Sequence, residues 1–130
     1  MSTLKTGKVK TTTIADELDT ESTAVTNVIN GSAKAWVTYI GFTNIIDESF
    51  NVTSVTDVST GKFTVNFTNP MEDINYCAVG AVGRYSSASN TRFPVQGPAL
   101  HRESTSSLFV TTGSNTSTVV DSEFYVAIFR

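Results

Sequence analysis

The strongest constraint on the fold is a two-residue alternation of apolar and polar side chains that recurs in short runs. In the run 62–67, for example, Phe63, Val65 and Phe67 are each separated by a polar residue. This period places alternate side chains on opposite faces of a strand. Fifteen Ser and twenty-one Thr make up 36 of the 130 residues, and the β-branched Thr side chain suits a strand better than a helix. The sequence therefore predicts a β-rich protein.

The alternation predicts six to eight short strands with turn residues between them. The strands are, in chain order, Ala33–Ile40, Ser49–Val58, Lys62–Phe67, Tyr76–Gly83, Ala99–Arg102, Ser107–Thr112 and Glu123–Phe129. The turn residues at 57–61 join the second and third of these into a hairpin. Short strands at this spacing predict an all-β fold over residues 31–130, an antiparallel β-sandwich or jelly-roll-like domain, with a closed barrel as the alternative.

Two strands carry bulky side chains on both faces. The last strand has Phe124, Val126 and Ile128 on one face and Tyr125, Ala127 and Phe129 on the other. Such a strand belongs in the middle of a sheet or at a contact between subunits. Trp36 lies in the middle of its strand and is expected in the core or at an interface rather than as a ligand platform. Cys77, on an apolar strand, is expected to be a buried small hydrophobic residue.

Residues 1–30 differ from the rest of the chain and predict an extended N-terminal anchoring arm. No aromatic residue occurs before Trp36, and lysines precede a group of acidic residues. Thr13 is placed to cap a short helical turn that contains Ile14 and Leu18, although so few residues do not hold a helix in water unless they pack on something else. Val28 and Ile29 likewise need a surface to bury against.

Charge and residue counts exclude several function classes. Twelve acidic and nine basic residues give a net charge of −3, which argues against nucleic-acid binding. No run approaches the ~20 apolar residues of a membrane span, so we expect no membrane insertion. Cys77 and His101 are single, which leaves little for a metal site, and we expect no cofactor. Because no Gly-x-Ser-x-Gly elbow accompanies His101, we also expect that the protein is not an enzyme.

The segment 84–98 predicts an exposed loop because it is rich in Ser, Asn, Gly and Pro. It combines aromatic rings with hydrogen-bonding side chains, which is the combination that sugar recognition needs. The candidate contacts to a cell-surface polysaccharide are Arg84, Tyr85, Asn90, Arg92 and Phe93. A loop that contacts another subunit, or a plain exposed turn, is the alternative interpretation.

Several segments resemble a module of tailed-phage tail fibres. The similarity lies in an Ala-Lys-Ala-Trp strand within 30–37, in a hairpin over 47–57 and 61–68, in Asp73–Tyr76 and in the last strand. It covers about residues 25–79 plus the C-terminal strand, in a matching order. One departure is the connection 38–46, which is more apolar here than the Gly-Thr-Gly-rich tract of the related modules. We expect its apolar residues to face another subunit or another virion protein.

The resemblance implies a bacteriophage virion structural protein, a trimeric tail-fibre-like β domain involved in attachment to the host cell, with no catalytic residues to carry over. Its partners would be two further copies, other tail or capsid proteins bound through the arm, and a host polysaccharide. It would be made in the host cytoplasm and lie on the tail or capsid surface. The alternatives are a capsid decoration or head-fibre protein and, third, a glycan-active enzyme. The interface candidates are Val28, Ile29, Trp36, Phe42 and Phe129.

Overall fold

A computed structural model describes residues 7, 11–15, 22–84, 97–113 and 118–130 of the chain. The chain separates into two compact units, Met1–Ser32 and Ala33–Arg130. Each unit is described by itself below.

The first unit contains a short strand pair and a short helix. Strand β1 (Thr13–Ala15) pairs antiparallel with β2 (Ser22–Ala24), and helix α1 (Val25–Gly31) follows directly. The predicted helical turn at Thr13 is wrong, because β-branched Thr13 and Ile14 are paired with β2, and the Val25 amide donates to the carbonyl of Thr12 (3.0 Å). Leu18 lies outside the described residues. None of the seven residues of α1 is buried.

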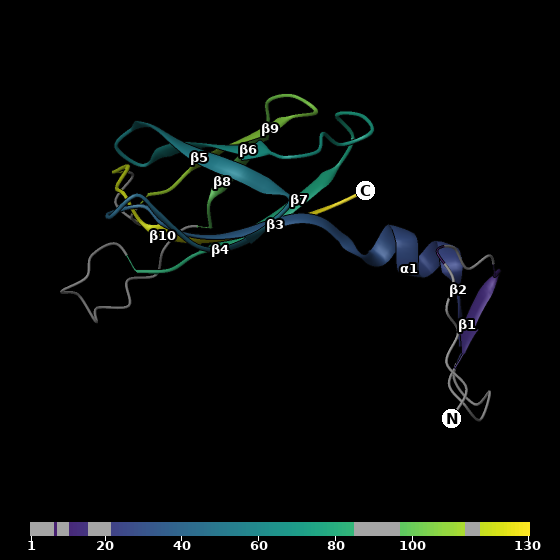
Figure 1. Ribbon diagram of the computed structural model, residues 1–130. Helices are drawn as coiled ribbons and strands as arrows, with labels where there is room; N and C mark the ends of the chain where they lie inside the picture. Colours follow the sequence, from purple (N-terminus) through teal and green to yellow (C-terminus); the bar gives the residue numbers. More distant parts are fainter. Residues whose placement is uncertain (1–6, 8–10, 16–21, 85–96, 114–117) are drawn as a thin grey trace. The chain divides into compact units, whose positions relative to one another are not determined.

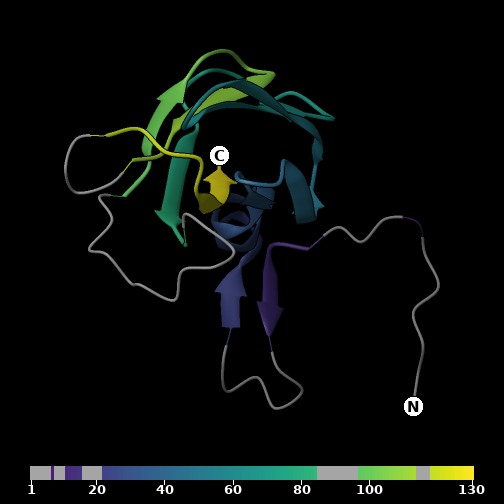
Figure 2. The same ribbon diagram turned by 90° about the vertical axis from the view of Figure 1, so that its left-hand side faces the viewer.

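The second unit is an antiparallel β-sandwich, as the sequence predicts (Figures 1 and 2). Sheet 1 has the order β4-β3-β10-β7 and sheet 2 the order β5-β6-β9-β8. Sheet 1 consists of β3 (Ala33–Ile40), β4 (Ile45–Phe50), β7 (Cys77–Val82) and β10 (Glu123–Phe129). Sheet 2 consists of β5 (Val52–Ser59), β6 (Lys62–Phe67), β8 (Ala99–Arg102) and β9 (Ser107–Thr111). All pairs of neighbouring strands are antiparallel.

The core lies between the two sheets and is built from every second residue of their strands. The buried apolar side chains are Ala35, Val37 and Tyr39 of β3, Phe63, Val65 and Phe67 of β6, Leu108 and Val110 of β9, Phe124, Val126 and Ile128 of β10, and Met71 and Tyr76 of the segment before β7. At one end, the rings of Tyr39, Phe63 and Phe124 lie with centroids 5.3 to 5.5 Å apart, tilted or edge-on to one another. This geometry adds to the stability gained from burial.

Strand β10 lies in the middle of sheet 1, between β3 and β7. This agrees with the prediction that a strand apolar on both faces is central or lies at a contact. One of its faces forms core, and the other is the outer face of sheet 1, because Tyr125, Ala127 and Phe129 alternate with the buried residues.

The predicted strand Ser49–Val58 is two strands in the structure, because the chain turns at Asn51 from sheet 1 to sheet 2. Asn51 has φ 55°, a left-handed conformation that Asn tolerates better than most residues. Its Nδ2 donates to the carbonyls of Lys34 (2.9 Å) and Asn69 (3.1 Å), and its Oδ1 accepts from the Asn69 amide (2.8 Å). The alternation alone does not reveal this corner.

Candidate assembly face

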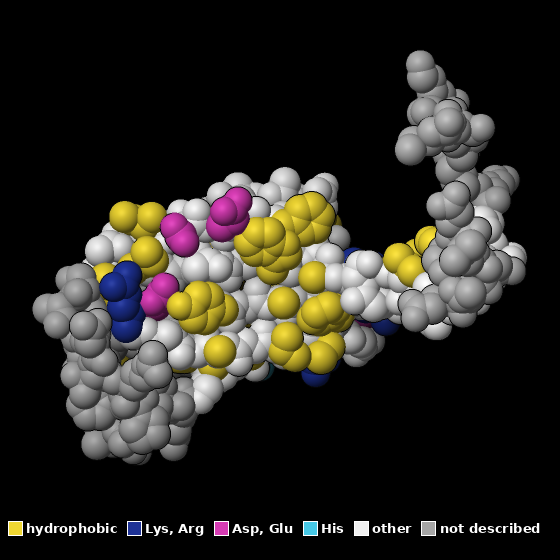
Figure 3. Space-filling view, turned by 90° about the horizontal axis from the view of Figure 1, so that it is seen from below, with side chains coloured by type: hydrophobic (Ala, Val, Ile, Leu, Met, Phe, Trp, Pro, Cys, Tyr) yellow, Lys and Arg dark blue, Asp and Glu magenta, His cyan; other side chains and the backbone are white. Residues whose placement is uncertain are grey.

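The outer face of sheet 1 is largely apolar. We call six outward side chains of its four strands the apolar face; they are Trp36, Phe50, Val79, Tyr125, Ala127 and Phe129. Thr38 and Glu48, which are cross-strand neighbours, also point outward and are polar. The strand register brings Phe50, Trp36, Ala127 and Val79 into one row across the whole sheet. Figure 3 shows hydrophobic side chains gathered over this side of the sandwich, with acidic residues toward one margin. The result is a broad apolar surface on a rigid sheet.

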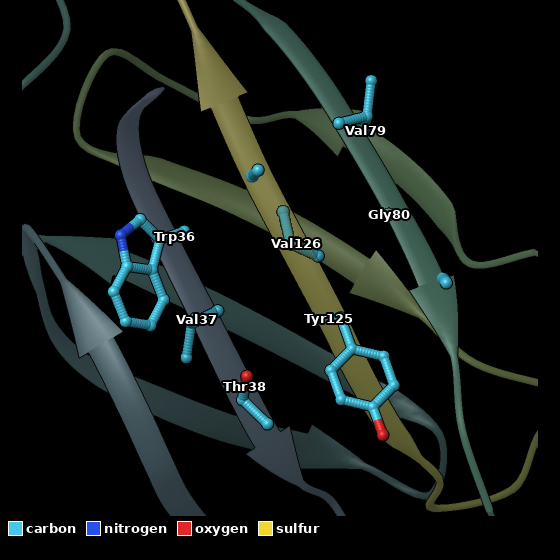
Figure 4. Close-up of a pocket in the computed structure, with 9 residues that line it drawn as sticks. Trp36, Val37, Thr38, Val79, Gly80, Tyr125 and Val126 are labelled. Atoms are coloured by element: carbon cyan, nitrogen blue, oxygen red, sulfur yellow. The ribbon is translucent and has the colours of Figure 1, made fainter. Parts of the chain in front are cut away.

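An open hollow of about 470 Å³ lies on this face. Small residues of two neighbouring strands, Gly80 and Ala81 of β7 and Ala127 of β10, line it together with the larger Trp36 and Tyr125 (Figure 4). Gly80 is required by the packing: a Cβ at this position would lie 2.7 Å from the carbonyl oxygen of Tyr125. The apolar face therefore has both protruding rings and a depression for a protruding side chain of a partner.

Several of these side chains have much of their surface in water. The exposed fraction is 54% for Phe50, 48% for Val79 and 40% for Tyr125, and Trp36 and Phe129 are half-buried. Monomeric proteins expose single apolar residues routinely, but a contiguous group on one sheet is typical of an interaction site.

A polar cluster borders the apolar face at Glu123, the first residue of β10. Arg84 Nε lies 3.2 Å from Glu123 Oε2, and its guanidinium lies over the ring of Phe42, 5.6 Å from the centroid. Burial raises the pKa of the Tyr125 phenol, and its hydrogen bond to Glu123 raises this pKa further. The Glu123 amide also donates to the carbonyl of Arg84 (2.7 Å). The cluster fixes Arg84 beside the first residue of β10.

The structure distributes the predicted site residues over both units. Trp36 and Phe129 belong to the apolar face. Phe42 lies in the connection between β3 and β4, against Arg84. Val28 and Ile29 lie on α1 with exposed fractions of 40% and 55%.

Of the predicted sugar contacts, only Arg84 lies in the described part of the chain. Its side chain is engaged with Glu123 and Phe42, although half of it remains exposed. Tyr85, Asn90, Arg92 and Phe93 lie outside the described residues.

Sequence reasoning missed Phe50 and Val79 as members of the apolar face. Phe50 was placed in a longer strand, so its cross-strand neighbour Trp36 was not apparent. The prediction that Cys77 is buried is wrong, because Cys77 begins β7 on the outward side and is exposed, with Phe129 as its cross-strand neighbour. Alternation in β7 gave two apolar faces, and only the assembled sandwich decides which of them is inside.

Other kinds of site find little support in the described residues. Among these residues, no group of three or more His, Cys, Asp or Glu side chains lies close enough together to hold a metal ion. His101 is exposed on β8, and its cross-strand neighbour is Phe109 rather than a carboxylate or a serine. Among the helices of the described ranges, none has the length and apolar character to cross a membrane.

Comparison with known proteins gives no match to a protein-family model, to a curated protein or to a solved structure. The resemblance to a tail-fibre module therefore stays a prediction.

Proposed function

We propose that this protein is a bacteriophage virion structural protein, a tail-fibre-like β domain that assembles as a homotrimer and takes part in attachment to the host cell. The observation that carries the proposal is the apolar face of sheet 1, which combines exposed rings with an open hollow. The order of the segments that resemble tail-fibre modules supports the virion part of the proposal, and that resemblance is also the ground for three copies.

The energetics of the apolar face favour association. Burial of an aromatic side chain removes about 150–250 Å² from water, at roughly 25 cal/mol for each Å². Covering the exposed half of Phe50 in a subunit contact would therefore contribute roughly 2–3 kcal/mol. Several such residues in one row are enough to offset part of the entropy lost on association.

The N-terminal unit fits the role of an anchor to another virion component. Val28 and Ile29 are exposed on α1, and no residue of this helix is buried. A seven-residue helix is marginal in water without tertiary packing. We therefore assign residues 1–30 to contacts with a neighbouring copy or another virion protein.

Sedimentation equilibrium and native mass spectrometry of the full chain test the proposal. We expect a trimer at micromolar concentration, and we expect Val79→Lys to shift it toward the monomer because a charge would be buried in the contact. The matched control is Thr56→Lys, which adds the same charge to an exposed position on sheet 2. A wild-type chain that stays monomeric across the concentration range would contradict the proposal.

A further inference from the structure

The outer face of sheet 2 carries different chemistry from the apolar face. The strand register places Thr56, Thr64, Phe109 and His101 in one row across all four strands, and Ser54, Asn66 and Ser107 in the next. We call these two rows the hydroxyl face. The residues that alternate with them along each strand, among them Val65, Leu108 and Val110, are buried in the core. The hydroxyl face is thus the solvent side of a well-packed sheet.

Hydrogen bonds within the hydroxyl face fix the orientation of its polar groups. Asn66 Nδ2 donates to Ser54 Oγ (3.1 Å) and to Thr56 Oγ1 (3.1 Å). Since both hydroxyl oxygens accept from the amide, their own protons are left to donate outward. The side chain of Asn66 is only partly exposed, so little further rotamer freedom is lost when a ligand binds there.

Phe109 supplies an apolar surface in the middle of this polar face. It is half-buried and is paired with Thr64 on one side and His101 on the other. An aromatic ring beside fixed hydroxyl and amide groups suits a sugar, because the C–H surface of a pyranose packs on the ring while its hydroxyl groups exchange hydrogen bonds with the neighbours.

The two rows contain no Asp, Glu, Lys or Arg. At the margins, Lys62 stands in the neighbouring row, and Glu103 accepts from Ser107 Oγ (3.2 Å). A charged ligand would find no ion-pair partner in the rows, and a protein partner would find little apolar core. The chemistry therefore favours an uncharged, hydroxyl-rich ligand.

We propose that the hydroxyl face binds a neutral polysaccharide, with Asn66, Ser54, Thr56 and Thr64 as the hydrogen-bonding group and Phe109 as the packing surface. This inference deepens the attachment part of the proposed function. It places a sugar contact on the rigid sheet rather than only in the segment 84–98. It needs no particular oligomeric state, since all its residues come from one copy.

Affinity electrophoresis in gels that contain dextran, mannan or galactan tests the inference with the full chain. We expect at least one of these polymers to retard the wild-type protein. We expect Asn66→Leu and Thr64→Val each to weaken binding to it by about tenfold, as the loss of one well-placed hydrogen bond does. Thr53→Val is the matched control on β5, because Thr53 bonds to Thr68 (2.9 Å) and lies in neither row.

Three outcomes would overturn the inference. They are migration that none of the three polymers changes, retardation that Asn66→Leu and Thr64→Val leave intact, and retardation that is lost only when Arg92→Ala alters the segment 84–98. Circular dichroism of each variant shows whether it is folded, and Phe109→Leu serves as a second, milder change of the packing surface. Sedimentation of the same samples separates the two proposals, because a monomer that binds dextran contradicts the trimer and supports the sugar site.

Discussion

The two outer faces of the sandwich are built by the same alternation and differ in what the outward positions carry. On sheet 1 the row across the strands is Phe50, Trp36, Ala127 and Val79, whereas on sheet 2 it is Thr56, Thr64, Phe109 and His101. Both rows stand on one shared core. The outward residues contribute less to the core than the inward ones, so their chemistry is free to differ between the faces. Under the two proposals above, sheet 1 meets another apolar surface and sheet 2 meets water or a sugar.

The largest change is expected from the core, because both faces depend on it. Phe63 is fully buried between Tyr39 and Phe124. Phe63→Ala should lower the free energy of unfolding by about 3–5 kcal/mol, since it removes a buried ring and leaves a cavity. Urea denaturation followed by circular dichroism measures the loss. The variant could instead keep wild-type stability and lose either self-association or polysaccharide binding alone. That result would contradict a core shared by the two faces.

The corner at Asn51 should be next in size, because it carries the chain from sheet 1 to sheet 2. Asn51→Ala loses four side-chain hydrogen bonds and puts a less tolerant residue at φ 55°. We expect a loss of about 2–3 kcal/mol. Asn51→Gly keeps the backbone conformation, so it should lose less than the alanine variant in the same denaturation experiment. Equal losses would show that only the side-chain bonds matter.

Much of the fold followed from the sequence because strands with strict alternation leave few choices. The bounds of β3, β6, β8 and β10 agree with the predicted strands. The corner at Asn51 did not follow, since a single residue with positive φ leaves no trace in the hydrophobic pattern. The outward position of Cys77 was missed for a related reason: when both faces of a strand are apolar, only the neighbouring strands decide which one is buried.

The site was predicted less completely than the fold. Trp36 and Phe129 were identified because they stand in strands that are bulky on both faces. Phe50 ends β4, the strand that follows β3, and this end was hidden inside a longer predicted strand. Val79 lies on β7, far along the sequence from its partner β10, and pairing across strands cannot be obtained from local alternation. The hydroxyl face was missed because Ser and Thr are so frequent that no single position stands out until register aligns them.

The contrast between the faces is sharpened by one substitution on each. Tyr125→Lys on the apolar face should weaken self-association by at least about tenfold, because a desolvated charge would face an apolar partner. Thr111→Lys, on the outer side of sheet 2 opposite Lys62, should leave association unchanged. Sedimentation velocity over a dilution series compares the two. If both variants weaken association equally, the apolar face is not the contact.

A pH titration of stability tests the core that both faces share, through the buried Tyr39. Burial raises the pKa of Tyr39, and the carboxylates of Asp57 and Asp121 raise it further. The folded protein then holds this proton at a pH where the unfolded chain releases it, so the stabilisation is complete below pH ~10 and is lost as the pH rises toward the folded pKa. Urea denaturation from pH 8 to 11 should show this decline, and Tyr39→Phe should make it shallower. Parallel curves for the two proteins would contradict it.

The smallest effect is expected at the margin of the apolar face, where Arg84 pairs with Glu123 at 3.2 Å. Half of the Arg84 side chain is exposed, so solvent screens the pair and Arg84→Ala should change the free energy of unfolding by no more than about 1 kcal/mol. Arg84→Lys keeps the charge but not the planar group above Phe42, and it should recover only part of this change. Denaturation at low and high salt separates the contributions, because the ion pair weakens with salt and the ring contact changes less. A loss well above 1 kcal/mol would mean that this cluster supports the apolar face as a structural element rather than bordering it.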